Sequence, residues 1–137
     1  MLALLDEARF APLFQPGSRA EVPIVAEIKN PSGRGPALKL TGQIDRLAVT
    51  EEAVLIVDYK TNRSAPTDVL GVAEAYLYQL AAYRLALAEI YPKRPVRAAL
   101  LWTEVPMMME IPAEMLDLNA TRLWQLDPAR LDAVAPR

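Results

Sequence analysis

The first half of the chain alternates between apolar and polar positions with the period of β-strands. Residues 21–29 predict a strand, and Pro23 within it has no N–H for a ladder, which favours an edge position or an irregular start of the strand. Two further runs, residues 37–50 and 53–60, are separated only by a Glu-Glu pair and predict a hairpin. The second run is apolar on both faces until its end. This is typical of a central strand that is covered on two sides.

Two other segments show the i, i+3, i+4 spacing of amphipathic helices. Residues 1–14 predict a short helix that ends near Pro12 and Pro16. After a polar loop, Thr67 is a suitable N-cap for a long helix over residues 68–90.

The last third of the chain adds the remaining elements of the fold. Residues 96–104 predict a strand with which residues 107–111 can pair, and one or two short helices follow. This order of helix, strands, long helix and strands is typical of an α/β sandwich of three layers. With 137 residues the chain is one domain: a lead-in helix over 1–16, a core over 17–111 and a helical tail over 112–137.

The composition excludes several kinds of chemistry. Cysteine and histidine are both absent, so disulfides, thiolate or imidazole metal sites, iron–sulfur clusters and Ser–His–Asp catalysis cannot be built from this chain alone. The formal net charge of −2 does not indicate a globally basic nucleic-acid binder, but it does not exclude a protein that binds DNA through a local surface. No apolar run reaches the ~18 residues of a membrane helix, and the first ten residues lack the basic start of a signal peptide. We therefore expect a cytoplasmic protein without a membrane partner.

Three charged residues form the most informative group in the sequence. Asp58 and Lys60 end the second hairpin strand on one face, roughly 7 Å apart by the rise of a strand, and Asp45 lies on the neighbouring strand. Tyr59 points to the opposite face but leaves its carbonyl at the strand end. Such hard oxygen ligands suit Mg²⁺ or Mn²⁺, and a lysine beside the metal can serve a water or charge at a phosphate. The group is equipped for metal-assisted phosphodiester hydrolysis.

An ordinary ion pair at a strand end explains an isolated Asp-x-Lys equally well, because so short a motif often arises by chance. The other polar residues expected near this motif favour a functional site. Glu21 opens the preceding strand and can bring a third carboxylate to the same edge, while Gln79 and Tyr83 lie four residues apart on one face of the long helix. Tyr83 taken alone is better explained as a core residue. A glutamine in an apolar stripe needs hydrogen-bond partners when it is buried.

In order along the chain, these motifs are Glu21-Val-Pro, Gly42-x-Ile-Asp45-Arg, Val57-Asp58-Tyr59-Lys60-Thr-Asn and Tyr76-x-x-Gln79-x-x-x-Tyr83. The series resembles the RecB-like branch of the PD-(D/E)xK nucleases over roughly residues 17–111. It is most similar to the C-terminal nuclease domains of AddA-type helicase–nuclease subunits. The resemblance implies a restriction-endonuclease-like α/β core with a mixed central sheet flanked by helices. It also implies a Mg²⁺- or Mn²⁺-dependent DNA exonuclease in double-strand-break repair.

The resemblance also implies a role for each site residue. Asp45, Asp58 and the Tyr59 carbonyl would bind the metal, and Lys60 would serve the attacking water. Glu21 would assist at the metal. Gln79 and Tyr83 would complete the site and contact DNA.

The chain departs from the family in two respects. RecB-like nucleases add a histidine ligand from a preceding helix, and this sequence has no histidine, so we expect weak or absent activity from this chain alone. No G-x-x-x-x-G-K-[ST] motif is present, so ATP would be used only by a helicase portion outside it. The absence of cysteine separates the chain from relatives with an iron–sulfur cluster, including the AddB-type subunit that the resemblance implies as its partner.

Two alternatives stay open at this point. The chain can be a nuclease fold that holds DNA or docks a partner without cutting, or a structural α/β domain whose polar residues coincide by chance. Intact Asp45, Asp58 and Lys60 favour the cutting enzyme, because a degenerate site would usually have lost at least one of them.

Overall fold

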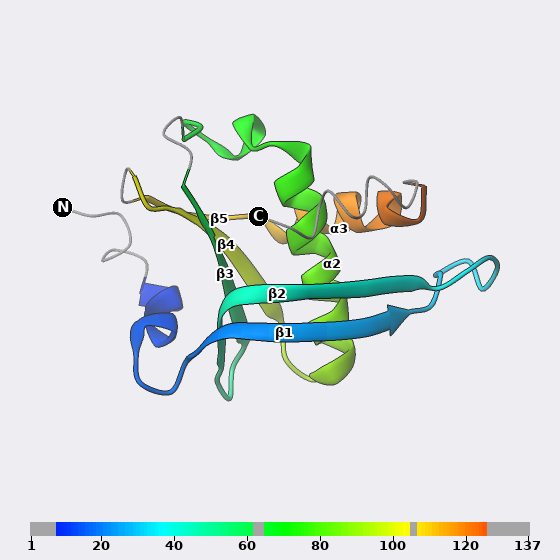
Figure 1. Cartoon of the computed structure of the whole chain (residues 1–137), viewed down its shortest axis with the longest axis horizontal. Helices are drawn as coiled ribbons and strands as arrows, with labels where there is room; N and C mark the ends of the chain where they lie inside the picture. The colour runs from blue at the N-terminus through cyan, green and yellow to red at the C-terminus, as the bar shows by residue number, and fades with distance from the viewer. Residues whose placement is uncertain (1–7, 62–64, 105–106, 126–137) are drawn as a thin grey trace.

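The computed structural model describes residues 8–61, 65–104 and 107–125, and within them five strands form one sheet in the order β1-β2-β3-β4-β5 (Figure 1). The strands are β1 (Arg19–Ile28), β2 (Leu38–Val49), β3 (Val54–Lys60), β4 (Val96–Trp102) and β5 (Met107–Glu110). Neighbouring strands are antiparallel except β3 and β4, which run parallel. The structure thus confirms the predicted mixed sheet.

Helices lie on both faces of this sheet. The longest helix, α2 (Glu74–Ile90), makes the crossover between the parallel strands β3 and β4 and packs against α3 (Ala113–Arg122) on one face. The 3-10 helix η1 (Ala8–Phe14) covers β3 and β2 on the other face. Two single turns of 3-10 helix, η2 (Val69–Gly71) and η3 (Leu123–Gln125), precede α2 and follow α3.

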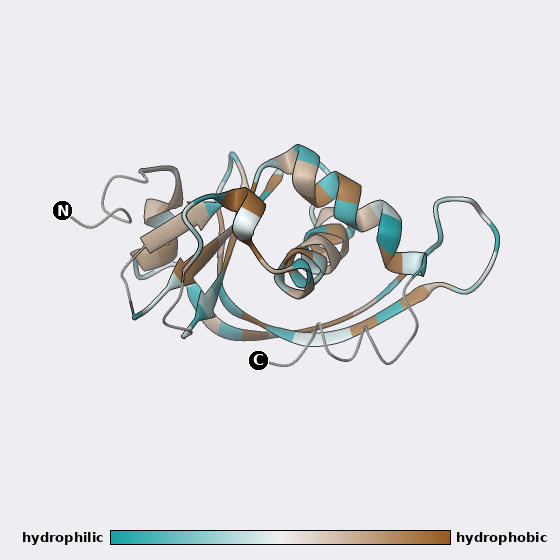
Figure 2. Cartoon of the chain, turned by 90° about the horizontal axis from the view of Figure 1, so that it is seen from above, coloured by the Kyte–Doolittle hydropathy of each residue, from teal (hydrophilic) through white to brown (hydrophobic). Residues whose placement is uncertain are grey.

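The hairpin of β1 and β2 extends well beyond the rest of the sheet. β1 pairs with β2 along its length, whereas β3 pairs with β2 only over Arg46–Val49. Residues 22–44 therefore form a two-stranded β-arm, which curves around α2 (Figure 2). Pro23 lies in β1 at the edge of the sheet, as the sequence predicts, where a missing N–H breaks no ladder.

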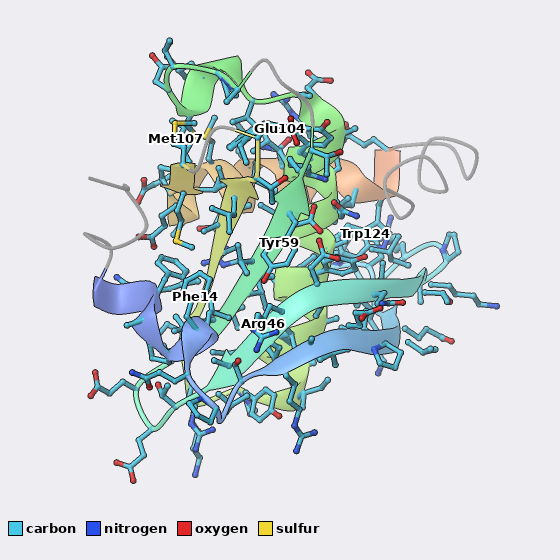
Figure 3. All side chains as sticks on the ribbon, turned by 60° about the vertical axis from the view of Figure 1, so that its left-hand side comes forward. Phe14, Arg46, Tyr59, Glu104, Met107 and Trp124 are labelled. Carbon is cyan, nitrogen blue, oxygen red and sulfur yellow. The ribbon has the colours of Figure 1, made fainter. Side chains whose placement is uncertain are left out.

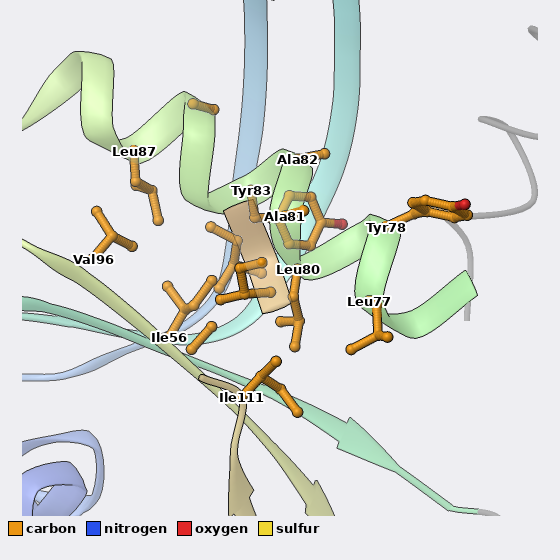
Figure 4. Close-up of a cluster of buried hydrophobic side chains, with 14 of the residues drawn as sticks. Ile56, Leu77, Tyr78, Leu80, Ala81, Ala82, Tyr83, Leu87, Val96 and Ile111 are labelled. Carbon is orange, nitrogen blue, oxygen red and sulfur yellow. The ribbon is translucent and has the colours of Figure 1, made fainter. Parts of the chain in front are cut away.

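Each face of the sheet has its own apolar core. On the η1 face, Phe10 and Leu13 pack against Leu55 and Val57 of β3, and Arg46 Nε donates to the Leu13 carbonyl at 2.7 Å; Figure 3 labels Arg46 on this side. On the α2 face, Ile56 packs against Leu80 and other residues of the helix (Figure 4). Because β3 contributes successive residues to opposite cores, it is the central, doubly covered strand that its sequence predicts.

The predicted long helix over residues 68–90 is wrong at its start. Thr67 does not cap it; instead Asp68 accepts a hydrogen bond from Leu70 N at 3.0 Å and caps the separate turn η2. The chain then becomes extended before α2 begins at Glu74. The break lies at Val72 and Ala73, whose backbone is extended, and Gly71 just before them has a low helix propensity.

The N-terminal helix also differs from its prediction. Within the predicted range 1–14, the structure describes only Ala8–Phe14, as 3-10 helix, and residues 1–7 lie outside the described part. Pro12 lies inside this helix and does not end it, because the fixed φ of proline matches the 3-10 value. In the described part of the tail, α3 and η3 confirm the predicted short helices. None of the described helices is long and apolar enough to span a membrane.

Candidate active site

Two carboxylates meet where the β2–β3 ladder ends. The last residue pair of that ladder is Arg46–Val57, so one step further along the same register Asp45 lies opposite Asp58. The Tyr59 N–H donates to Asp45 Oδ2 at 2.7 Å, which anchors the carboxylate to the end of β3. Both aspartates are almost completely buried, with 3% and 2% of their surface exposed. The structure thus brings together the two predicted metal ligands.

The Asp58 carboxylate lies in an unfavourable environment for its charge. Burial, with a smaller contribution from the nearby Asp45, raises its pKa from 3.8 to about 6 against the opposing effect of the Lys60 ammonium. Within the described residues, the Lys60 ammonium lies against Asp58 Oδ2, and Oδ1 accepts no described hydrogen bond. Buried carboxylate oxygens without donors are unusual in folded proteins and point to a cation.

Lys60 is held from three sides. Its Nζ lies 2.5 Å from Asp58 Oδ2 and 3.3 Å from Gln79 Oε1, and it stands 3.9 Å above the centre of the Tyr76 ring. Its side chain is buried, so water does not screen these interactions. β3 alternation places Asp58 and Lys60 on the α2 face while Tyr59 packs on the η1 face, as the sequence predicts.

Tyr83 joins α2 to the backbone of β2. Its hydroxyl donates to the Gln43 carbonyl and accepts from the Gln43 N–H, each at 3.3 Å. A Cβ at Gly42 would lie 2.5 Å from that hydroxyl, so only glycine allows this approach. Burial raises the Tyr83 pKa above its usual 10.0, against the hydrogen bonds from Gln43 and Gln79. The Gly42-x-Ile-Asp45 motif of β2 and the Tyr76-x-x-Gln79-x-x-x-Tyr83 motif of α2 are therefore in direct contact.

Glu21 does not join the two aspartates. The β1–β2 register on both sides places it across from Asp45, but its backbone has φ 53° and its own pair is missing from the ladder. Its side chain is exposed and accepts a hydrogen bond from Gln43 Nε2 at 3.3 Å. Within the described residues, no group of three acidic side chains lies close enough to hold a metal ion. The predicted cluster of three carboxylates is thus reduced to two.

An irregularity in β2 explains how Asp45 reaches the α2 side. Ile44 and Asp45 are buried in succession, which breaks the alternation of the strand opposite the left-handed Glu21. Beyond the break, Arg46 contacts η1 on the other face. A non-glycine residue with positive φ is uncommon and is often found at functional sites.

The residues present fit a divalent cation. Two buried carboxylates supply four hard oxygens, of which Asp58 Oδ1 accepts no described hydrogen bond. Tyr59 lies beyond the last β2–β3 pair, where its carbonyl is a further candidate ligand. A cation between Asp45 and Asp58 would offset the repulsion that raises the Asp58 pKa.

Sequence reasoning gave no role to three residues that shape the site: Tyr76, Gly42 and Gln43. The signal for Tyr76 was its spacing, since positions i, i+3 and i+7 place it on one helix face with Gln79 and Tyr83. No sequence pattern predicts the hydrogen bonds between the Gln43 backbone and the Tyr83 hydroxyl, because this contact depends on how α2 crosses the sheet.

Comparisons with known proteins identify the family of the chain. Residues 3–132 match the family described as the PD-(D/E)XK nuclease superfamily. No curated protein matches the sequence. The chain itself carries the D-x-K part of that pattern as Asp58-Tyr59-Lys60, and the residue before Asp45 is Ile44 instead of proline.

Two solved structures are similar to this chain. A candidate exonuclease from Eubacterium rectale is similar over 96% of this chain and 49% of its own length, with a TM-score of 0.54 and 15% identity. The crystal structure of SSO0001 is similar over 90% of this chain and 56% of its own length, with a TM-score of 0.44 and 16% identity. The chain therefore spans about half the length of these proteins.

Proposed function

Because the chain belongs to the PD-(D/E)XK nuclease superfamily, we propose that it hydrolyses phosphodiester bonds in DNA with the help of a divalent metal ion. The observation that carries this proposal is the buried group of Asp45, Asp58 and Lys60 at the end of the β2–β3 ladder. A structural domain has no need for two facing buried carboxylates with so few donors, because their desolvation opposes folding. The non-cutting alternative is disfavoured for the same reason.

Asp45, Asp58 and the Tyr59 carbonyl would hold the ion. Mg²⁺ or Mn²⁺ suits this donor set, since both prefer oxygen ligands and accept phosphate oxygens. When bound, the ion would supply Lewis acidity toward the phosphate and lower the pKa of a water. The Tyr59 N–H keeps Asp45 Oδ2 in place, so that this ligand is oriented before the substrate arrives.

Lys60 would act on the attacking water or on the charge that develops at the phosphate. Asp58, Gln79 and Tyr76 fix its ammonium, and its burial makes any charge interaction stronger than in water.

Gln79 and Tyr83 would act mainly as positioning residues. Both are almost completely buried, and their polar atoms contact Lys60 and the β2 backbone. Their predicted contact with DNA stays a prediction. Glu21, exposed across from Asp45, would assist at the metal only after its carboxylate leaves Gln43.

The wider context is also part of the proposal. The ordered motifs support an exonuclease domain of an AddA-type helicase–nuclease in double-strand-break repair, with ATP used by a motor elsewhere and an AddB-type partner subunit. The similar fold of a candidate exonuclease supports the exonuclease class.

A metal-dependent cleavage assay tests the proposed function. On linear DNA with Mn²⁺, Lys60→Met is expected to lower the cleavage rate by about 10²–10⁴-fold, since the variant keeps the volume but not the charge of the side chain. The exposed Lys93→Met is the matched control and is expected to cut at the wild-type rate. Equal rates for Lys60→Met and the wild type, or full activity in EDTA, would contradict the proposal.

A further inference from the structure

In the part of the chain that the structure describes, two acidic residues lie on the elements that carry or contact Lys60, and their charge opposes the approach of a polyanion. Glu104 follows β4, whose Trp102 pairs with Lys60, and Glu74 begins α2 two residues before Tyr76. Both glutamates are exposed. Since DNA affinity comes largely from basic contacts to phosphates, a nuclease with this surface needs a cationic contact elsewhere.

The tip of the β-arm carries such charge. Over residues 28–41, the chain has three basic residues, Lys29, Arg34 and Lys39, and no acidic one. All three side chains are exposed. The arm tip, defined as residues 29–39, stands away from the sheet core as a hydrophilic loop (Figure 2).

The turn at the tip is internally ordered. Asn30 Oδ1 accepts from Ser32 N at 3.0 Å and Ser32 Oγ at 2.9 Å, and Gly33 N donates to the Asn30 carbonyl at 2.9 Å. Gly33 and Gly35 have φ of 75° and 82°, which glycine adopts without strain. Binding through a loop that is already ordered loses less conformational entropy.

The pairing of β1 with β2 places one acidic residue beside the basic residues of the arm tip. Lys39 pairs with Glu27, the only acidic residue in the outer half of β1, and no ion pair joins them in the described structure. Glu27 therefore weakens the positive field of the tip without neutralising Lys29 or Arg34.

The tip lies too far from the metal ligands to act in the chemistry. At about 3.3 Å per residue, the strand from Asp45 to the tip spans roughly 20–30 Å, which equals about 6–9 base pairs of duplex.

We propose that the arm tip binds the phosphate backbone of DNA about 6–9 base pairs from the reacting phosphate, with Lys29 and Arg34 as its main contacts. This inference rests on the proposed function. It adds a second DNA contact that controls affinity for longer duplexes and leaves the chemical step unchanged.

Binding to DNA hairpins of two lengths tests the inference. The 137-residue chain is titrated in EDTA, by fluorescence anisotropy, against stems of about 4 and about 20 base pairs, of which only the longer spans the distance to the tip. The double variant Lys29→Ala/Arg34→Ala is expected to bind the long stem about 10-fold more weakly at 0.1 M salt, with a salt slope smaller by about 2. The same variant is expected to bind the short stem within about twofold of the wild type, because that stem does not reach the tip.

Two control variants separate a local contact from a general charge effect. Lys93→Ala/Arg94→Ala removes the same two residue types from the α2–β4 connection and is expected to leave both affinities unchanged. Glu27→Gln is expected to strengthen binding of the long stem about twofold, since it removes a nearby negative charge.

Several results would overturn the inference. These are a long-stem affinity that is the same in the double variant and the wild type, an equal loss on both stems, an equal loss in the Lys93/Arg94 control, or no binding of either stem by the wild type. A different result would contradict the proposed function and leave this inference intact. If tip-dependent binding persists while Lys60→Met cuts at the wild-type rate, the arm contact stands and the assignment of the nuclease site falls.

Discussion

At the scale of single residues, the site is defined by how the Lys60 ammonium is held. Lys60 has a carboxylate, an amide oxygen and an aromatic face around its Nζ, contributed by Asp58, Gln79 and Tyr76. The aromatic face attracts the ammonium without accepting a hydrogen bond in its plane, so Tyr76 orients the lysine without using the N–H that Asp58 and Gln79 leave over.

Substitutions of Tyr76 separate this role from simple packing. Tyr76→Phe keeps the ring and is expected to change kcat less than about threefold. Tyr76→Leu loses the ring and is expected to lower kcat by up to about 30-fold, corresponding to a cation–π interaction of about 0.5–2 kcal/mol, with KM for DNA unchanged. Steady-state cleavage kinetics of both variants check this, and equal losses of kcat in the two variants would show that the ring face of Tyr76 does not position Lys60.

Asp58 makes the stability of the metal-free protein depend on pH. Its folded pKa of about 6 lies above the usual 3.8, so the folded state binds the proton more tightly than the unfolded state. The associated stability is complete below about pH 4 and is lost as pH rises through about 6. The loss is on the order of 2–3 kcal/mol.

Asp58→Asn removes this titration. In EDTA, the free energy of unfolding of the variant is expected to exceed that of the wild type at pH 7 and to lack its decline between pH 4 and 6. Urea denaturation at a series of pH values measures both. A parallel pH dependence in the two proteins would show that Asp58 is not the titrating group.

At the scale of elements, the site depends on the contact between α2 and β2. Gly42→Ala would place a methyl group 2.5 Å from the Tyr83 hydroxyl and is expected to lower the free energy of unfolding by about 1–3 kcal/mol. In a Tyr83→Phe background the same substitution is expected to cost less, because the closest atom is gone. A double-mutant cycle by urea denaturation checks the coupling. Additive effects would mean that Gly42 is required for another reason.

The elements themselves were largely predictable, and the exceptions have physical causes. Period-two alternation and a doubly apolar run located β1, β2 and β3, because burial dictates those patterns directly. The start of α2 was misplaced, because the extended backbone of Val72 and Ala73 divides the predicted helix and the apolar spacing does not mark that break.

The candidate site was predictable in its chemistry but only partly in its geometry. Alternation along β3 placed Asp58 and Lys60 on one face, and the hairpin brought Asp45 beside them. Glu21 was expected in the same cluster because it opens a neighbouring strand. Its positive φ and its contact with Gln43 are tertiary outcomes that strand periodicity does not encode.

At the scale of the whole molecule, the chain spans about half the length of the structures that it resembles. The sequence has no histidine, and the two aspartates supply few ligands, so we expect weak Mg²⁺ binding by this chain. A longer version that adds an upstream helix with a histidine is expected to bind Mg²⁺ more tightly and to cut faster, while Mn²⁺ partly restores cutting by the short chain. Side-by-side metal titrations and assays on linear DNA check this. Equal rates for the two versions in Mg²⁺ would show that a histidine ligand is dispensable.

The most direct test of the metal site is the position of a bound ion. Crystals of the chain soaked in Mn²⁺ are expected to show one anomalous peak between the carboxylates of Asp45 and Asp58, within about 2.0–2.6 Å of an oxygen of each. The peak is expected to vanish in Asp58→Asn. Ordered carboxylates with no peak between them, or an ion that binds equally well in Asp58→Asn, would contradict the assignment of this pair as the metal site of a nuclease.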